Sequence, residues 1–160
     1  MKRAFTLLEL IFVIVVIGIL AAMAIPKFSG LAKNSKITSE LATASTIQSA
    51  IEDVHSEWVV SESGFTWGNG KTEKDLTSEG YPKQLGDCQN GHPFNWILKN
   101  SSTVDAKWSC SVDNGKFVYR GPASQSSSGV KENGEGKPDS NDCWIYDPKT
   151  GSFDLQEDCN

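Results

Sequence analysis

The chain has 160 residues, of which 38% are apolar and 22% are charged, a size that suits one modest domain. Its 15 Lys and Arg against 20 Asp and Glu give a net charge of −5. This balance lacks the basic surface that a dedicated nucleic-acid binder needs, and the length excludes a large multi-domain enzyme.

Apolar residues are concentrated at the N-terminus, where residues 5–28 hold 19 of them in 24 positions. The remainder, residues 29–160, carries 12 basic and 19 acidic side chains and therefore a net charge of −7. The sequence thus predicts a membrane end followed by an acidic, water-soluble head.

Residues 5–28 are predicted to form a transmembrane helix, because the 21 residues 5–25 reach about 32 Å as a helix, enough to cross a bilayer core. Lys2 and Arg3 precede this span, so the positive-inside rule places the N-terminus in the cytoplasm and the head outside it. A cleaved signal peptide is the alternative, with Ala22-Met23-Ala24 as its cleavage site, but the apolar period continues through that point.

Residues 29–58 are predicted to continue the helix in amphipathic form. The apolar positions that follow a helical period are Phe28, Leu31, Ile37, Leu41, Ala44, Ile47, Ile51, Val54 and Trp58. The opposite, polar face is predicted to hold Lys33, Lys36, Ser39, Glu40, Ser45, Ser49 and Glu52.

The segment KRAFTLLEL at residues 2–10, followed by IGILAA at 17–22 and Ile25-Pro26, resembles type IV prepilins and the related type II secretion pseudopilins. The resemblance implies a leader of residues 1–4 that prepilin peptidase removes by cutting between Ala4 and Phe5, and N-methylation of the new terminus at Phe5. The family usually has Gly where this chain has Ala4, which is still a small residue.

Glu9 is a carboxylate inside an apolar span, where insertion costs about 2.5–3.5 kcal/mol unless a partner offsets it. One interpretation is a capping box, because Thr6-x-x-Glu9 precedes an apolar run. The other, which the resemblance implies, is an assembly contact between Glu9 and the charged amino terminus of a neighbouring subunit's Phe5.

Gly18 and Pro26 are predicted to mark a helix break, since Pro26 leaves the Ala22 carbonyl without its helical partner and Gly18 weakens the helix. A simple kink at the membrane exit is one outcome. Unwinding of the segment between them when subunits pack is the other, by analogy with type IV filaments.

Residues 59–160 are predicted to form a disulfide-containing globular head in which a Gly-rich connecting region, 59–87, precedes short strands. The predicted strands are 94–98, 106–112, 116–120, 143–146 and 152–155. Turns at Asp113-Asn114-Gly115 and 147–151 join two hairpins. The expected fold class is therefore α+β and pilin-like, with a long N-terminal helix packed on an antiparallel sheet of about four strands.

Residues 121–142 lack an apolar period and are rich in Gly and Ser, which predicts an exposed loop. In a filament subunit such a loop could set the surface chemistry, or it could be an insert without a role.

The four cysteines, Cys88, Cys110, Cys143 and Cys159, all lie in the head, which the predicted topology places in an oxidising compartment. Three connectivities are open, and the sequential pairing is preferred because each pair flanks neighbouring strands.

Metal and cofactor sites find little support in the sequence. Cys88-x-x-x-His92 is half of a zinc site without a second half. Asp139, Asn141 and Asp142 supply oxygens for calcium, which major pseudopilins often bind, but their spacing matches no EF-hand and a solvated acidic turn is the default. No cofactor is predicted, with calcium as the weaker alternative.

No catalytic residues are predicted, because neither His55 nor His92 belongs to a nucleophile motif. The five tryptophans are expected to fill a small core, with a ligand-binding shelf as the alternative.

The sequence therefore predicts a non-enzymatic structural subunit of a type IV pilus-like filament. The implied partners are further copies of the chain, prepilin peptidase, an inner-membrane assembly platform and membrane lipid, without direct nucleic acid. The subunit is expected in the bacterial inner membrane with its head in the periplasm, and later in a filament. The alternatives are a pseudopilin and a membrane-anchored binding module that never polymerises.

Overall fold

The computed structural model describes residues 6–61, 63–113, 115–131 and 134–159. The chain separates into two compact units, residues 1–35 and 36–160.

Helix α1 (Leu7–Val60) is a single helix of 54 residues that ends two residues beyond the predicted Trp58. It continues through Gly18 and Pro26 without interruption of its helical assignment, and the predicted kink or assembly-linked unwinding between these residues stays a prediction. Hydrogen bonds of the surrounding turns maintain the helix even though a proline removes one donor. In the first unit the large apolar side chains of α1 are exposed along its whole length.

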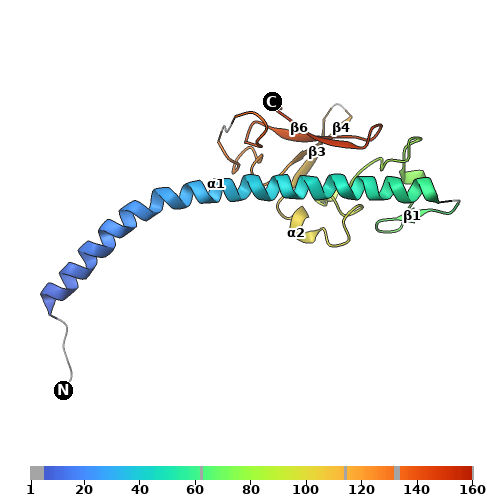
Figure 1. The fold of residues 1–160 in the computed structure, drawn as a ribbon. Helices are drawn as coiled ribbons and strands as arrows, with labels where there is room; N and C mark the ends of the chain where they lie inside the picture. The colour runs from blue at the N-terminus through green and yellow to red at the C-terminus, as the bar shows by residue number, and fades with distance from the viewer. Residues whose placement is uncertain (1–5, 62, 114, 132–133, 160) are drawn as a thin grey trace, which may run out of the picture. The chain divides into compact units, whose positions relative to one another are not determined.

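The second unit contains a four-stranded antiparallel sheet in the order β3-β4-β5-β6, and the second part of α1 lies along it (Figure 1). The strands are β3 (Ser109–Asp113), β4 (Lys116–Arg120), β5 (Cys143–Asp147) and β6 (Ser152–Gln156). The predicted α+β, pilin-like fold with a small antiparallel sheet is confirmed.

Both predicted turns join strands of this sheet. Asp113 pairs with Lys116 across a two-residue connection, and Gly115 has the positive φ of 80° that such a tight turn requires. At the second turn the Gly151 N–H donates to the Asp147 carbonyl at 2.8 Å, and Gly151 also has a positive φ, of 72°. A Cβ on Gly151 would collide with the Tyr81 ring. Both the positive φ and this close contact therefore require glycine at the turn.

An aromatic core fills the space between α1 and the sheet. Ala44, Ile47 and Ile51 of the helix join Phe94, Trp108, Tyr119, Trp144, Tyr146 and Phe153 in one buried cluster. Trp144 stacks on Phe153 with ring centroids 5.3 Å apart. Trp108 and Trp144 thus fill the core, as the sequence predicted for strand tryptophans.

The predicted helix face is confirmed at Ile37, Ala44, Ile47, Ile51 and Val54, which are buried, but not at Phe28, Leu31 and Leu41, which are exposed. Leu41, expected in the core, is 38% exposed, and its neighbour Glu40, expected on the polar face, is fully buried. The carboxylate takes the place of an apolar side chain because donors from distant segments converge on it.

Residues 94–98 form turns rather than the predicted strand. The Leu98 N–H donates to the Phe94 carbonyl at 3.0 Å, one helical step away, and the Phe94 N–H donates to the Asp105 carboxylate at 3.1 Å. These hydrogen bonds satisfy the backbone groups without pairing to a neighbouring strand. The apolar run therefore reflects the burial of this segment and not a β-strand. The predicted strand 106–112 also begins too early, because the short helix α2 (Ser102–Asp105) precedes β3.

The connecting region 59–87 contains more regular structure than the predicted loop. Its elements are β1 (Thr66–Trp67), β2 (Lys71–Thr72) and the 3₁₀ turn η1 (Glu73–Asp75), with η2 (Cys88–Asn90) just beyond it. Phe65, Trp67 and Leu76 form a second buried cluster with Val54 of α1.

The predicted exposed loop 121–142 is wrong where the loop meets the helix. Ala123 and Ser124 are fully buried, and Val130 packs with Ala123 and Ile37 in a third apolar cluster. The sequence shows no period here because the contacts come from single residues of a turn. Ser126–Ser128 at the tip of this turn are exposed, as predicted.

The outer edge of β6 is covered by one side chain of α1. Gln48 accepts a hydrogen bond from the Phe153 N–H at 2.9 Å and donates to the Gly151 carbonyl at 3.1 Å. The side-chain amide of Gln48 therefore bonds to backbone groups at the edge of β6 that a neighbouring strand would otherwise bond to. This contact protects an edge that could pair with another chain.

Candidate functional site

The described N-terminal residues form a capping box at the start of α1. The Thr6 N–H and hydroxyl donate to Glu9 Oε2 at 2.9 and 2.8 Å, and the Glu9 N–H donates to the Thr6 hydroxyl at 3.3 Å. The local interpretation of Glu9 is therefore confirmed for the single chain. Ala4 and Phe5, the predicted cleavage and methylation site, lie outside the described residues.

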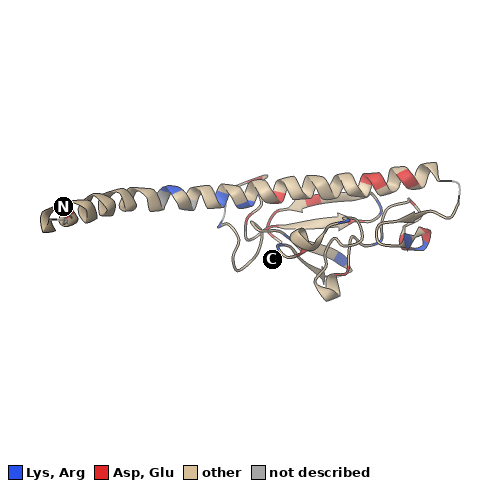
Figure 2. Cartoon of the chain, turned by 90° about the horizontal axis from the view of Figure 1, so that it is seen from below, with Lys and Arg blue, Asp and Glu red and all other residues tan. Residues whose placement is uncertain are grey.

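Beyond this cap, α1 presents an apolar surface without charge from Leu10 to Pro26 (Figure 2). This is the one helix of the described residues that is long and apolar enough to cross a membrane, and the span is not buried within the chain. Glu9 is thus an isolated acidic group at the start of a surface that needs lipid or other apolar helices to cover it.

Two disulfides, Cys88–Cys110 and Cys143–Cys159, join the four cysteines in the sequential pairing. The first fastens η2 to β3, and the second fastens the C-terminal segment to β5. Because Cys88 is in a disulfide, it supplies no thiolate for a zinc site.

Arg120 of β4 ties the loop to the C-terminal segment through backbone carbonyls. Its guanidinium donates to the carbonyls of Asp142 at 2.7 Å, Ser124 at 3.2 Å and Cys159 at 3.3 Å. These contacts hold the polypeptide around the second disulfide in one arrangement.

The predicted calcium residues lie at an acidic depression of about 260 Å³. Its lining residues are Gly134, Glu135, Asp139, Asn141, Asp142, Glu157 and Asp158. Asp142 accepts hydrogen bonds from the Asp139 N–H at 2.9 Å and the Asp158 N–H at 3.2 Å, and Asp139 Oδ1 accepts from the Asn141 N–H at 3.0 Å. Burial raises the pKa of Asp142, and the negative charges of Asp139 and Glu157 raise it further.

These carboxylates thus hold the backbone of the turn. Within the described ranges no three acidic, His or Cys side chains are arranged to hold a metal ion, and calcium stays a prediction.

Both histidines have structural surroundings. His55 stacks on Tyr81 with ring centroids 4.2 Å apart. His92 Nδ1 lies 3.5 Å from Oδ2 of the buried Asp105, which also fixes the Phe94 backbone. The first contact packs His55 against Tyr81, and the second lies at the turn that precedes Phe94.

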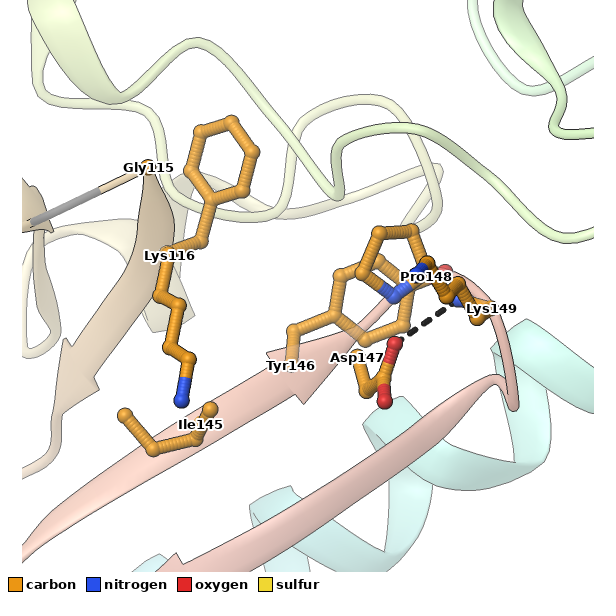
Figure 3. A pocket seen from close by; sticks show the side chains of 8 residues that line it. Gly115, Lys116, Ile145, Tyr146, Asp147, Pro148 and Lys149 are labelled. Atoms are coloured by element: carbon orange, nitrogen blue, oxygen red, sulfur yellow. Dashed lines mark hydrogen bonds between the residues drawn. The ribbon is translucent and has the colours of Figure 1, made fainter.

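A surface cavity of about 300 Å³ opens where β4 and β5 diverge beyond the Phe117–Tyr146 pair (Figure 3). Lys116 and Asp147 flank the opening, and the Asp147 carboxylate accepts a hydrogen bond from the Lys149 N–H at 2.9 Å. None of the sequence-predicted site residues lines this cavity.

Sequence reasoning missed the polar centre of the head. Glu40 Oε2 accepts hydrogen bonds from the N–H groups of Ala123 and Ser124, and Oε1 accepts from the Ser124 hydroxyl and the Trp144 indole. One signal in the sequence pointed to the burial of Glu40. This residue precedes Leu41 and lies close to the helix face that Ile37 and Ala44 define, so a small rotation of the predicted face places Glu40 in the core.

Comparison with known proteins identifies the N-terminal segment. The prokaryotic N-terminal methylation motif matches residues 1–25. A fimbrial protein of Pseudomonas aeruginosa is 28% identical over 133 residues, covering 69% of this chain and 86% of the relative. The type IV major fimbrial protein FimA of Dichelobacter nodosus is 30% identical over 94 residues, covering 58% of this chain and 57% of the relative. No solved structure matches the chain significantly.

A long N-terminal helix on a four-stranded antiparallel sheet, preceded by a methylation motif, defines a pilin-like protein. The chain carries the N-terminal methylation motif and is similar to fimbrial proteins, one of them a type IV major fimbrial protein. Its relatives are fimbrial proteins, a structural class and not an enzymatic one.

Proposed function

We propose that the chain is the structural subunit of a type IV pilus-like filament, processed by prepilin peptidase and polymerised through α1. The observation that carries the proposal is the uncharged segment of α1 from Leu10 to Ile25, whose large apolar side chains are exposed and which lies in the matched methylation motif just after a single acidic residue. Such a surface is stable in lipid before assembly and against sister helices after it, since both environments are apolar.

In this proposal residues 1–4 are the leader, residues 5–28 span the bacterial inner membrane, and residues 29–58 carry the helix into a periplasmic head, residues 59–160. Lys2 and Arg3 stay in the cytoplasm by the positive-inside rule. The two disulfides of the head fit an oxidising compartment. The partners are further copies of the chain, the peptidase, an inner-membrane assembly platform and lipid.

Glu9 acts in two successive roles. In the single subunit its carboxylate caps the start of α1 through Thr6, which satisfies backbone groups inside the apolar environment. During assembly it pairs with the amino terminus of a neighbouring subunit's Phe5, which stays positively charged after N-methylation. The low local dielectric strengthens this attraction and fixes the register between neighbours.

The segment between Gly18 and Pro26 unwinds when subunits pack closely. In the single chain this segment is helical, and Gly18 and Pro26 are the two residues that lower the cost of opening it. Filaments then contain a non-helical stretch that the free subunit lacks.

A pilus subunit is favoured over a pseudopilin because the named relatives are fimbrial proteins. A membrane-anchored binding module that never polymerises is the alternative from another class. The mass of the mature chain separates the two: loss of residues 1–4 with gain of one methyl group supports the filament subunit, and an intact N-terminus in a cell with the peptidase overturns it. Imaging of sheared surface filaments then distinguishes a pilus from a pseudopilus, which stays in the envelope.

Substitution of Glu9 tests the assembly contact. Glu9→Gln keeps a capping box, so it should preserve the helix start but abolish filaments if the charge is required. Thr6→Ala is the matched control, because it removes the two hydroxyl contacts of the cap and leaves the charge. Normal filaments from Glu9→Gln would refute the charge pairing.

A further inference from the structure

The buried carboxylate of Glu40 is held by four donors from segments far away in the sequence. The Ala123 and Ser124 N–H groups donate to Oε2 at 2.6 and 3.1 Å. The Ser124 hydroxyl and the Trp144 indole N–H donate to Oε1 at 2.7 and 2.8 Å. A Cβ on Gly121 would lie 2.6 Å from the same carboxylate, so the loop closes tightly over it.

All four donors of Glu40 are uncharged, and its side chain is fully buried. An apolar side chain in the place of Glu40 would leave these buried donors without an acceptor, which lowers stability, so the site is specific for an acceptor at this position of the helix. The best-attested use of a buried polar group is to select one register among several that apolar contacts allow.

The other helix contacts in the core leave the register weakly defined. Ala44, Ile47 and Ile51 repeat at helical spacing, and apolar packing is non-directional, so a shift of α1 by one turn exchanges similar side chains. Directed contacts come from three polar residues: Glu40, Lys36, whose Nζ donates to the Ser128 carbonyl at 2.6 Å, and Gln48 at the edge of β6. Glu40 is the one of these with four directed hydrogen bonds.

We propose that Glu40 is a positioning residue for assembly, which fixes the register of α1 against the head. The inference rests on the proposed function, because a filament subunit joins its neighbours through the helix. Each head then meets the heads of neighbouring subunits only if α1 and the head are in one particular register. A one-turn slip displaces the head by about 5.4 Å along the helix, which is enough to separate surfaces that meet in the filament.

Spin labels measure this register directly. The four native cysteines are paired, so Ser56→Cys on α1 and Asp154→Cys on β6, both at exposed positions, supply the two labelled thiols. Electron paramagnetic resonance on the full chain in detergent should give one narrow label-to-label distance. In the Glu40→Leu background we expect a second population, displaced by up to about 5 Å, one helical turn.

Two variants serve as controls. Glu57→Leu replaces an exposed acidic residue of the same helix and should keep the single distance. Glu40→Gln keeps the size of the side chain and replaces one acceptor oxygen, with its two hydrogen bonds, by an NH2 group, so it replaces Glu40→Leu as the deciding variant if that protein shows no cooperative melting. A single, unshifted distance in the deciding variant overturns the proposal.

Filament yield provides the functional readout. Glu40→Leu should be cleaved and inserted normally, yet give at least tenfold fewer sheared filaments than Glu57→Leu, at a growth temperature below the lowered melting temperature of its head. Equal yields from the two variants overturn the assembly role. Failure of the unaltered chain to form filaments refutes the proposed function alone, because the label distances still decide whether Glu40 sets the register.

Discussion

Ile47 and Leu41 provide a direct test of which face of α1 carries the head. Ile47 is fully buried in the aromatic cluster, whereas Leu41 is 38% exposed although the helical period assigns both to one face. Ile47→Ala removes three carbon atoms, and transfer alone costs about 2.4 kcal/mol at about 0.8 kcal/mol for each carbon. The residual cavity adds to this, so we expect about 3–4 kcal/mol in all.

Leu41→Ala is the matched control. It removes the same number of carbon atoms from a partly solvated position and should cost less than about 1 kcal/mol. A domain of this size loses about 3 °C in melting temperature for each kcal/mol, so the expected shifts are about 10 °C for Ile47→Ala and under about 3 °C for Leu41→Ala.

Near-ultraviolet circular dichroism of the full chain in detergent measures these shifts, because all five tryptophans lie between residues 58 and 144. The signal therefore reports on the head and not on the apolar part of the helix. Equal losses of melting temperature from Ile47→Ala and Leu41→Ala would mean that both side chains are buried, as the helical period predicts. That result would refute the packing described for α1.

Four further predictions follow from the head. Replacing Cys143 and Cys159 by Ser should cost about 3 kcal/mol in a denaturant titration, from the entropy of the 16-residue loop that the bond closes; no loss would contradict a structural bond. Gly121→Ala should destabilise the head in thermal melting because its Cβ meets the Glu40 carboxylate, whereas Gly30→Ala, with open space around it, should not; similar losses would contradict the close fit. Gln48→Ala should accelerate hydrogen exchange at the Phe153 amide more than at the Phe117 amide, and uniform acceleration would contradict the edge-capping role. Burial raises the pKa of Asp142, so its ionisation opposes folding, and the stability it contributes at low pH is lost as the pH rises through that raised pKa. Asp142→Asn should therefore flatten the decline of stability above about pH 4, and an unchanged pH profile would contradict this.

Local signals in the sequence were sufficient for the elements that depend on local chemistry. The helical period located α1 to within two residues of its end, and the turn residues Asn114-Gly115 and Pro148–Gly151 located both hairpins of the sheet. The capping box at Thr6 and Glu9 is also local, since it depends on residues three apart.

Elements that depend on contacts across the chain were missed. The donors of Glu40 lie 83 to 104 residues away, so no window around the helix could show that its carboxylate is buried. The apolar run 94–98 was assigned to a strand because burial and strand formation give the same short pattern. The Asp105 carboxylate, which accepts a hydrogen bond from the Phe94 N–H, is the contact outside this run that helps to keep it in turns.

The order of the two disulfides has a consequence for how the head matures. Both Cys88 and Cys110 precede Cys143 in the chain, and the two closed loops neither overlap nor enclose each other. Each bond therefore joins neighbouring cysteines in sequence, and a chain that emerges from its N-terminal end offers each pair its own partner before the next pair is exposed. The native pairing thus needs no exchange between the two bonds.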